Sequence, residues 1–592
     1  MKHLKDITVL VLGLGDSGLA MARWSARCGA AVRVWDSREA PPQAAALAEH
    51  VPQALLTSGE LTDELLADVQ LVLKSPGLAP TDARIAGPVA RAADRGALVQ
   101  GELELFARAL ADLKAERGYA PQVVAITGTN GKTTTTAMAA LMIERAGRRV
   151  AMAGNVGPTM LQTLADALAL EPQGVAVGEA AAPHSSPVPE GEGTGRSDAV
   201  AESACEAQTD QDADESLPSA PGGETEGEGA APQDDEAPLE LAPPPPAAPV
   251  FEHLPEVWVL ELSSFQLDDA KGFEPDAATV LNVTQDHLDW HGTMAAYVDA
   301  KARVFGKQAV MVINRDDPAV EQLVPEPIPQ KGRNVKPIER SVLRFGLDAP
   351  RRPGDFGVMV ENGMAWLVRA MEADETVRRT RRGAAVEEED LHIQRLMPAD
   401  ALRVRGRHNA ANALAALALA VAIGCPLAPM LHGLREYRGE PHRVAYVATV
   451  NGIDAFDDSK GTNVGATVAA INGLGADRAP ARLVVILGGD GKGQDFSPLA
   501  APLSRHARAV ATLGRDAPAV EAAIAGAGIA VQRHDTLEAA TRWCFERAHA
   551  GDAVLLSPAC ASLDMFRNYP HRAQVFVDEV LALAGEQGEV AT

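Results

Sequence analysis

Apolar runs of strand length alternate with longer helical stretches in three blocks of the chain. The first block opens with ITVLVLGLGDSGLAMARWSARCGAAVRVWDSR (residues 7–38), which has the pattern of a strand, a glycine turn, a helix and a second strand. The second begins at VVAITGTNGKTT (123–134) and closes with the helical HNAANALAALALAVAIG (408–424), and the third starts at about Glu440. This alternation is typical of α/β domains built on parallel sheets.

We therefore expect an α/β protein of three domains, because 592 residues exceed what one hydrophobic core supports. The predicted domains are a Rossmann-like N-terminal domain (1–102), a central domain with a P-loop ATPase-like parallel sheet (103–439) and a Rossmann-like C-terminal domain (440–592). In the third domain, ARLVVILGGDGKG and AVLLSPACASLD are the clearest strand-to-loop units.

The central block is interrupted between residues 171 and 250 by a tract rich in Pro, Gly, Glu and Ala. It holds 18 Asp and Glu residues, one Arg and almost no large apolar side chains. Such a tract cannot offset its ordering entropy by burial, so we expect a disordered acidic insertion. Loop-closure entropy grows only with the logarithm of length, so the central domain can still fold around it. A tolerated passenger and a docking tract for a basic partner both fit this composition.

Charge and composition exclude several classes of protein. The net charge of −26 and the aromatic content of 4% argue against a nucleic-acid-binding protein. No stretch approaches the roughly 18 apolar residues of a membrane span, and the N-terminus lacks a signal cleavage site, so we expect no membrane insertion. The cysteines are odd in number, far apart and without metal-ligand spacing, namely Cys28, Cys205, Cys425, Cys544 and Cys560. They fit a reducing compartment, and we expect a cytoplasmic monomer.

The stretch QVVAITGTNGKTTTTAMAALMIERAG predicts a phosphate-binding loop between a strand and a helix. Gly128 and Gly131 let the backbone curl, and the amides at the start of a helix point at a bound anion. Lys132 adds a positive charge, and Thr133 supplies a hydroxyl for Mg²⁺. The usual loop has a further glycine where this chain has Ile126. We therefore expect a shortened loop that still binds a nucleoside phosphate.

Candidate metal ligands follow the insertion. Glu261 ends the apolar run VWVLE, where parallel strands present ligand groups, and Mg²⁺ prefers carboxylate oxygens. NVTQDHLDWH places Asp286, His287 and His291 close together. The four-residue spacing of the two histidines could suggest zinc, but no Glu-bearing zinc motif accompanies it. A polar loop with one hydrogen-bonded histidine is the alternative.

These residues resemble the Mur ligase family, ATP-dependent amide ligases that build the peptide of bacterial cell-wall precursors; folylpolyglutamate synthases are their relatives. The resemblance covers nearly the whole chain except the acidic insertion. The motifs that carry it are, in order, GLGDSG, SPG, GELELF, ITGTNGKTT, GNVG, LELSSFQL, NVTQDHLD, GRHNAANALAALALA, PHR, DDSKGTNVGAT, LGGDGKGQDF and LSPACASLDMFRNY. The resemblance implies ATP-dependent addition of D-glutamate to UDP-N-acetylmuramoyl-L-alanine through an acyl phosphate, with two Mg²⁺ ions.

The resemblance also implies a set of residues around the phosphate loop. In the family a lysine on the helix after the Asp-His motif is carbamylated, and Lys301 is its counterpart, although from the sequence alone it would be a surface lysine. Carbamylation needs a neutral amine, which desolvation favours. The implied catalytic residues are Lys132, His287, Lys301 and Arg443. The implied ATP-binding residues are Gly128, Thr129, Asn130, Gly131, Lys132, Thr133, Thr134, Asn409, Arg443 and Asp458. The implied metal ligands are Thr133, Glu261, His287 and Lys301 as the carbamate.

The substrate residues implied by the resemblance lie in the first and third blocks. GLGDSG with Asp36 also matches a dinucleotide fingerprint, whereas the resemblance implies the UDP group of the substrate. Asp16 would repel a diphosphate unless its side chain points away. The implied UDP-substrate residues are Gly15, Asp16, Ser17, Gly18, Ser37, Arg38, Ser75 and Asn155. The implied D-glutamate residues are Thr462, Lys492, Ser562 and Tyr569. Taken singly, several of these would be turn formers or exposed residues, and Asn409 with Asn412 would be helix caps.

Rival functions use only part of these signals. A related Mur ligase or a folylpolyglutamate-synthase-like enzyme would share the phosphate loop but use another amino acid or acceptor. A nicotinamide oxidoreductase would leave the phosphate loop unused, and a nucleotide-binding switch would not need LSPACASLDMF. A nucleophilic role for Cys560 is disfavoured because no histidine base lies at a recognisable spacing.

Overall fold

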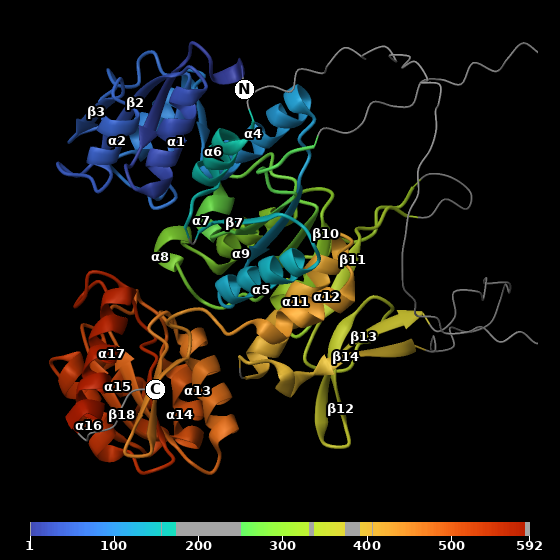
Figure 1. The fold of residues 1–592 in the computed structure, drawn as a ribbon. Helices are drawn as coiled ribbons and strands as arrows, with labels where there is room; N and C mark the ends of the chain where they lie inside the picture. Colours follow the sequence, from blue (N-terminus) through green and yellow to red (C-terminus); the bar gives the residue numbers. More distant parts are fainter. Residues whose placement is uncertain are drawn as a thin grey trace, which may run out of the picture. The chain divides into compact units, whose positions relative to one another are not determined.

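The computed structural model describes residues 2–155, 157–172, 250–330, 337–372, 391–404 and 406–586. Most of the predicted acidic insertion, residues 173–249, lies outside the described residues. The described residues form three sheets, each covered by helices (Figure 1). The predicted α/β class with parallel sheets is confirmed, while the exact domain boundaries stay a prediction. In the described part of the chain, no helix is both long and apolar enough to cross a membrane.

The first sheet is fully parallel, with strand order β3-β2-β1-β4-β5. Its strands are β1 (Thr8–Leu12), β2 (Ala31–Asp36), β3 (Leu55–Ser58), β4 (Leu71–Lys74) and β5 (Leu98–Gln100). Its helices are α1 (Asp16–Arg27), α2 (Ala44–His50) and α3 (Ala86–Asp94), and α4 (Glu102–Arg117) leads into the central sheet. The predicted strand, turn, helix and strand of residues 7–38 are therefore confirmed. The glycine turn lies at the carboxyl end of β1, the edge where open parallel sheets bind ligands.

The central sheet has nine strands, in the order β14-β13-β12-β11-β10-β9-β6-β8-β7. The strands are β6 (Gln122–Thr127), β7 (Val150–Gly154), β8 (Val257–Glu261), β9 (Ala277–Val280), β10 (Val310–Asn314), β11 (Val342–Phe345), β12 (Phe356–Glu361), β13 (Met364–Glu372) and β14 (Leu391–Pro398). From β7 to β12 neighbours pair in parallel, but β12, β13 and β14 pair antiparallel. The predicted parallel central sheet is therefore confirmed from β7 to β12, and it has an antiparallel edge because β12 and β13 follow each other through a tight turn with no crossover helix between them.

Helices cover both faces of the central sheet. They are α5 (Lys132–Arg145), α6 (Met160–Leu170), α7 (Ser264–Asp268), α8 (Leu288–His291), α9 (Met294–Ala302), α10 (Pro318–Glu321), α11 (Arg407–Ala422) and α12 (Leu427–Glu436). One hydrophobic core joins β6 to α5, α11 and α12, and a second joins the same strand to α4 and α6 and continues into the first sheet. Because both faces of β6 are buried, its run VVAI is apolar throughout, as predicted.

The third sheet has the order β15-β16-β20-β17-β18-β19, with β15 antiparallel and the other strands parallel. The strands are β15 (Ala445–Val450), β16 (Ile453–Asp457), β17 (Leu483–Gly488), β18 (Ala507–Leu513), β19 (Ala530–Arg533) and β20 (Ala553–Leu556). The helices are α13 (Val464–Arg478), α14 (Ala500–His506), α15 (Ala517–Ile524), α16 (Leu537–Arg547) and α17 (Tyr569–Glu586). Short 3-10 helices complete the described elements: η1 (Lys2–Leu4), η2 (Arg303–Phe305), η3 (Ala399–Ala401), η4 (Ser497–Leu499) and η5 (Ala525–Ala527).

Candidate active site

The predicted phosphate loop joins β6 to α5, and α5 begins at Lys132 as expected. Gly128 and Gly131 have φ angles of +153° and +84°, and a Cβ on Gly131 would lie 2.5 Å from the Asn412 Oδ1. Asn282, which follows β9, accepts from the Asn130 amide at 2.9 Å and donates to the Asn130 carbonyl at 3.0 Å. The shape of the loop is therefore fixed from two sides. Its helix amides can bind phosphate without further rearrangement.

Two lysines converge on one carbonyl of this loop. Lys132 Nζ and Lys301 Nζ each donate to the Gly128 carbonyl oxygen at 2.9 Å. Lys301 is only 1% exposed, so the expectation of a surface lysine is wrong; α9 turns it inward against the Tyr297 ring. Burial lowers the pKa of Lys301 well below its usual value, and the nearby charge of Lys132 adds to the effect. Burial also lowers the pKa of Lys132. A neutral amine is therefore accessible at Lys301.

Acidic and imidazole groups lie close to these lysines. Glu261 ends β8 with its carboxylate buried, and it accepts from Asn155 Nδ2 at 3.0 Å. The His287 amide donates to Asp286 Oδ1 at 3.0 Å. Burial lowers the pKa of the His287 imidazole to about 4; the Asp286 charge opposes this, while Lys492, Lys132 and Lys301 reinforce it. The imidazole is therefore neutral at pH 7 and can accept a proton or a metal.

Three residues of the last third of the chain contact or influence this loop. Arg443 donates to Thr133 Oγ1 at 2.7 Å, although the two lie 310 positions apart. Asn463 donates to Asn130 Oδ1 at 3.0 Å. Burial raises the pKa of Asp458 to about 7, while a hydrogen bond from Ser557 and the charge of Arg443 oppose the shift. Arg443 and Asp458 were expected at this site from the sequence. Asn463 was not, although it lies within the motif DDSKGTNVGAT.

The residues implied for D-glutamate gather at one edge of the third sheet. Thr462, Lys492 and Ser562 follow the carboxyl ends of β16, β17 and β20, which are adjacent parallel strands. The loops after β17 and β20 are tied together by a bridge between Asp490 and Ala561. Tyr569, at the start of α17, accepts a hydrogen bond from Lys460 at 3.0 Å and lies under its ammonium. A small dicarboxylate would meet cations and hydroxyls at this edge.

The glycine turn after β1 is a second cradle, with a different charge. A Cβ on Gly18 would lie 1.9 Å from the Gly13 carbonyl oxygen, so only glycine fits there. Ser75 donates to the same oxygen at 2.9 Å. Asp36 accepts from the Leu14 amide at 2.7 Å and is paired through both carboxylate oxygens with Arg38. The Arg38 side chain holds the pKa of Asp36 at about 2.

The other residues implied for the UDP group lie around this turn. The Asp16 carboxylate, whose repulsion of a diphosphate was a concern, accepts from Gln43 at 2.7 Å. Ser37 accepts from Arg84 at 2.9 Å. Gly15 precedes α1, and Ser17 lies in its first turn. The Asn155 side-chain amide donates to Glu261 Oε1 at 3.0 Å, and its predicted contact with the UDP substrate stays a prediction.

The structure bears on two alternatives that the sequence left open. Asn409 and Asn412 do not cap α11, since the residue before its first turn is Gly406; Asn412 reaches the phosphate loop and donates to Asn409 Oδ1 at 3.2 Å. His291 Nε2 lies 2.9 Å from Ser264 Oγ, which supports a polar loop with one hydrogen-bonded histidine.

The described residues contain no group of three or more His, Cys, Asp and Glu side chains that could hold a metal ion by itself. A hard cation such as Mg²⁺ needs fewer protein ligands, because phosphate and water oxygens complete its shell. The Thr133 hydroxyl and the Glu261 carboxylate offer such oxygen ligands at the phosphate loop. The donor set therefore fits Mg²⁺ and does not fit structural zinc.

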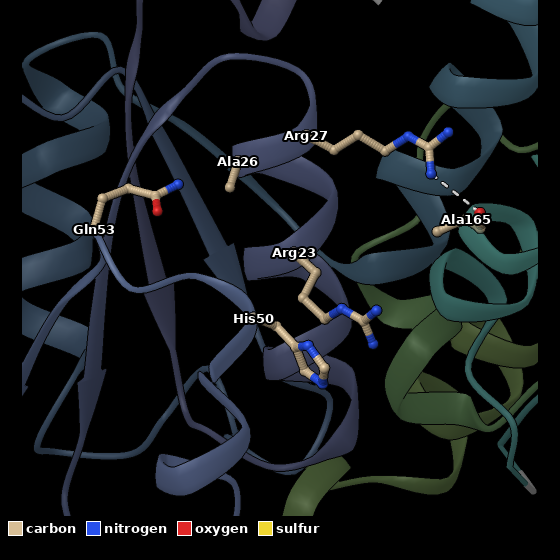
Figure 2. A pocket seen from close by; sticks show the side chains of 6 residues that line it. All are labelled: Arg23, Ala26, Arg27, His50, Gln53 and Ala165. Carbon is tan, nitrogen blue, oxygen red and sulfur yellow. Dashed lines mark hydrogen bonds between the residues drawn. The ribbon is translucent and has the colours of Figure 1, made fainter. Parts of the chain in front are cut away.

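A separate hollow of about 340 Å³ lies beside α1 (Figure 2). Its lining residues are Arg23, Ala26, Arg27, His50, Gln53 and Ala165. Arg27 donates to the Ala165 carbonyl oxygen at 3.1 Å, and Arg23 donates to Gln162. These arginines connect α1 to α6, and none of the candidate site residues lines this hollow.

Comparison with known proteins agrees with this arrangement. The Mur ligase middle domain matches residues 126–177 and 243–420. The Mur ligase MurD-like N-terminal domain matches residues 7–100, and the Mur ligase glutamate ligase domain matches residues 442–560. These matches contain the phosphate loop, the glycine turn after β1, and Thr462 and Lys492 of the third sheet, whereas Ser562 and Tyr569 follow the last matched residue.

Three curated relatives are similar over almost their full length. A protein of Albidiferax ferrireducens is 51% identical over 590 residues, covering 99% of this chain and 98% of the relative. One of Polaromonas sp. is 46% identical over 678 residues, covering all of both chains. One of Burkholderia mallei is 50% identical over 586 residues, covering 98% of each chain. All three are named UDP-N-acetylmuramoylalanine–D-glutamate ligase. The chain belongs to the Mur ligase family.

Proposed function

We propose that this chain joins D-glutamate to UDP-N-acetylmuramoyl-L-alanine at the expense of ATP, in the synthesis of peptidoglycan precursors. The observation that carries the proposal is the meeting of Lys132, Lys301 and Arg443 at one phosphate loop. Two cations, Lys132 and Arg443, beside a lysine whose amine can be neutral suit a reaction in which a phosphoryl group carries the developing charge. The relatives described above carry the same activity in their names.

ATP would bind with its phosphates on the loop from Gly128 to Thr134. Lys132 and Arg443 would neutralise the terminal phosphate oxygens, and Arg443 already lies against Thr133 at the start of α5. Asp458 would meet the nucleotide from the third sheet. Asn409, in the first turn of α11 and hydrogen-bonded to Asn412, would lie near the adenine.

The two other substrates would bind at the edges of the outer sheets. The turn from Gly15 to Gly18 would hold the diphosphate of the UDP group, with Ser37, Arg38 and Ser75 around it. Asn155 would contact the same substrate nearer to Glu261. D-glutamate would place its carboxylates at Lys492, Thr462 and Ser562, beside Tyr569.

Mg²⁺ would be held by Thr133, Glu261, His287 and Lys301 as its carbamate, with two ions expected. When bound, the ions would screen phosphate charge and polarise the transferring group. Neutral Lys301 reacts with CO₂ and loses one proton, so that a buried cation becomes an anionic oxygen ligand. The lowered pKa of Lys301 supports this role, because carbamylation needs a neutral amine and a lower pKa increases the neutral fraction at pH 7.

The proposed reaction has two steps. A carboxylate oxygen of the L-alanyl group attacks the γ-phosphorus of ATP, which forms an acyl phosphate and releases ADP. The neutral amine of D-glutamate then attacks the acyl carbon, which forms the amide and releases phosphate and a proton. His287, with its pKa lowered to about 4, is uncharged at pH 7 and keeps a lone pair for Mg²⁺, so the proton would leave with the released phosphate or to water.

We further propose that the enzyme works as a monomer in the cytoplasm. No disulfide joins the cysteines of the described residues, which suits a reducing compartment. Sedimentation of the purified chain would test the monomer directly.

The decisive experiment measures ADP and phosphate release with Mg²⁺-ATP and UDP-N-acetylmuramoyl-L-alanine. Parallel reactions contain D-glutamate, L-glutamate or no amino acid. We expect turnover with D-glutamate alone. Turnover with a different amino acid or acceptor would retain the ligase reaction and refute the proposed substrates, and ADP release without an amino acid would refute coupled ligation.

A further inference from the structure

Lys74 is a buried cation next to the glycine turn of the first sheet. It ends β4, and only 4% of its side chain is exposed. Its Nζ lies 2.8 Å from Asp269 Oδ2 and donates to the Leu78 carbonyl oxygen at 2.9 Å. The next residue, Ser75, donates to the carbonyl oxygen of Gly13 in the turn. Neither Lys74 nor Asp269 belongs to the residues assigned to the reaction above.

Stability alone does not explain this ion pair. Removing the Lys74 ammonium from water is costly, and apolar pairs of similar volume often stabilise a fold equally well or better. An ion pair with a buried ammonium and a carboxylate that is 19% exposed does, however, define where its two segments meet. Here the segments are the end of β4 in the first sheet and the end of α7 in the central sheet region.

Asp269 follows a short segment anchored at the phosphate-loop site. Glu261 ends β8, and α7 starts three residues later at Ser264, with a capping box formed by Ser263 and Gln266. Asp269 is the residue at the carboxyl end of that helix. Lys74 is therefore connected to Glu261 through its ion pair with Asp269 and the short helix α7.

A second connection passes through aromatic rings. We define the aromatic group as Phe265, Trp290, His291 and Tyr297. Lys74 Nζ lies 5.6 Å from the Trp290 ring centroid, which is 4.8 Å from that of Phe265. The Phe265 ring lies 4.7 Å from that of His287, so the group reaches the candidate catalytic imidazole.

The same group continues to Lys301. The His291 and Tyr297 rings are 5.3 Å apart, and Lys301 Nζ lies 4.5 Å from the Tyr297 ring centroid. The aromatic group thus has Lys74 at one end and Lys301 at the other. Tyr297 is buried, and the other three rings are partly buried and contact their neighbours, so a displacement of Lys74 would be passed along the group.

We propose that Lys74 is a positioning residue that sets the distance between the diphosphate end and the reacting carboxylate end of the substrate. The proposal rests on the proposed function, since that substrate would bind the glycine turn with its UDP group and bring its alanyl carboxylate to the ATP γ-phosphate at the phosphate loop. Lys74 itself touches neither end. It fixes the turn, through Ser75, relative to α7 and the aromatic group.

The test compares a long ligand with a short one. UDP contacts only the turn, whereas UDP-N-acetylmuramoyl-L-alanine spans both ends. In the double variant Lys74→Met/Asp269→Leu, we expect the Kd of UDP to stay within twofold. We expect the Kd of the whole substrate to rise about tenfold and kcat for ADP release with D-glutamate to fall at least tenfold. The KM for ATP should not change. A merely structural role would change both ligands or neither.

Asp269→Glu is the second variant, because it keeps the charge and the fold but lengthens the acid by one methylene group. We expect the melting temperature to stay close to that of the wild type and the whole-substrate Kd to rise. Lys74→Arg, which keeps the ion pair, should recover part of the lost kcat. The matched control is Arg344→Met/Glu321→Leu, which removes a pair at 2.8 Å on β11 and α10, and it should leave both Kd values unchanged.

Three outcomes would overturn the positioning role. They are wild-type kcat and Kd in the double variant, an equal loss of UDP and whole-substrate binding, and a control variant with the same losses as Lys74→Met/Asp269→Leu. A wild-type protein without D-glutamate-dependent turnover would refute the proposed function and this role together. A fully active wild type with any of the three outcomes would refute the positioning role alone.

Discussion

Two glycine-rich turns, which we call cradles, share a backbone plan but differ in the charged side chains around them. They are the turn after β1 (residues 13–18) and the phosphate loop after β6 (residues 128–134). Each follows a buried parallel strand and precedes a helix, α1 or α5. In each, one glycine cannot be replaced: a Cβ would lie 1.9 Å from the Gly13 carbonyl oxygen at Gly18 and 2.5 Å from the Asn412 side chain at Gly131. The difference lies in the side chains around them.

The charged group that contacts the turn in the first cradle is the carboxylate of Asp36. It accepts a hydrogen bond from the Leu14 amide, and both of its oxygens are paired with Arg38. The cradle of the central sheet has Lys132 and Lys301 on one carbonyl and Arg443 beside it. Amide dipoles are enough to hold a diphosphate that does not react. Charge that develops during phosphoryl transfer needs full cations, so the second cradle suits chemistry and the first suits binding.

Of the changes considered, removal of the Lys132 ammonium should have the largest effect on activity. Lys132→Met takes the main cation from the second cradle, so we expect kcat to fall about 10²–10³-fold. The variant should fold at least as stably as the wild type, because burial disfavours the charged amine. ADP-release kinetics and calorimetry measure the two effects. A kcat within tenfold of the wild type would mean that the second cradle acts mainly as a binding site, like the first.

Lys301 should be carbamylated to an extent that depends on pH, and we expect no such modification in the first cradle. With ¹³C-bicarbonate, we expect a carbamate signal that grows as pH rises, because the neutral amine is the reactive form, and that levels off above the folded pKa of Lys301. Lys301→Met should abolish the signal and lower kcat about 10²-fold. Lys132→Met should weaken the signal, since losing the neighbouring charge raises the pKa of Lys301 and leaves the anionic product without a cation. A signal of unchanged intensity in Lys301→Met would place the carbamate elsewhere.

Gly18→Ala should affect the first cradle alone. The new Cβ collides with a backbone oxygen, so the start of α1 must move, at a cost of about 1–3 kcal/mol of stability. We expect the KM for UDP-N-acetylmuramoyl-L-alanine to rise about tenfold while the KM for ATP stays constant. Gly15→Ala is the matched control for stability, because a Cβ there meets nothing within 4 Å. An equal rise in both KM values would show that the two cradles are not independent.

Both cradles could be predicted from the sequence because their signals are local. Apolar strands, glycines and a following helix lie within about 25 contiguous residues, and the backbone conformation follows from those residues. The side chains that fix the second cradle could not be predicted in this way. Asn130 and Asn282 are 152 positions apart, and Arg443 and Thr133 are 310 apart.

Other features of the fold could not be predicted because they also depend on residues that are distant in the sequence. The burial of Lys74 has no local signal, because Asp269 lies 195 positions away in the sequence. Lys301 has a nearby signal in Tyr297, one helical turn before it, but the polar neighbours of Lys301 are typical of a surface lysine. The antiparallel edge of β12 to β14 was missed because strand direction depends on the turn between the strands and not on their apolar pattern. Burial of polar groups is a property of the assembled fold, and local sequence carries little signal for it.

Asp36 should give the smallest effect, and one that depends on pH. The pKa of its carboxylate in the folded chain is about 2, against an ordinary value of 3.8, because Arg38 and two backbone amides favour the ionised form. A depressed pKa stabilises the fold above the unfolded pKa, and this contribution is lost as pH falls from about 4 through 2. Arg38 is half-exposed, so we expect only about 1–2 kcal/mol at pH 7.

Asp36→Asn should therefore destabilise β1 and β2 by that amount at pH 7 and by much less at pH 2.5, measured by hydrogen exchange of the amides in those strands. Asp552, which pairs with Arg508 in the third sheet, provides the control, because Asp552→Asn should leave exchange in β1 and β2 unchanged. Loss of the carboxylate also releases Arg38 to face a bound anion. The KM for the UDP substrate should then change no more than a few-fold, and a large rise would mean that Asp36 holds the turn in its binding shape as well as stabilising it.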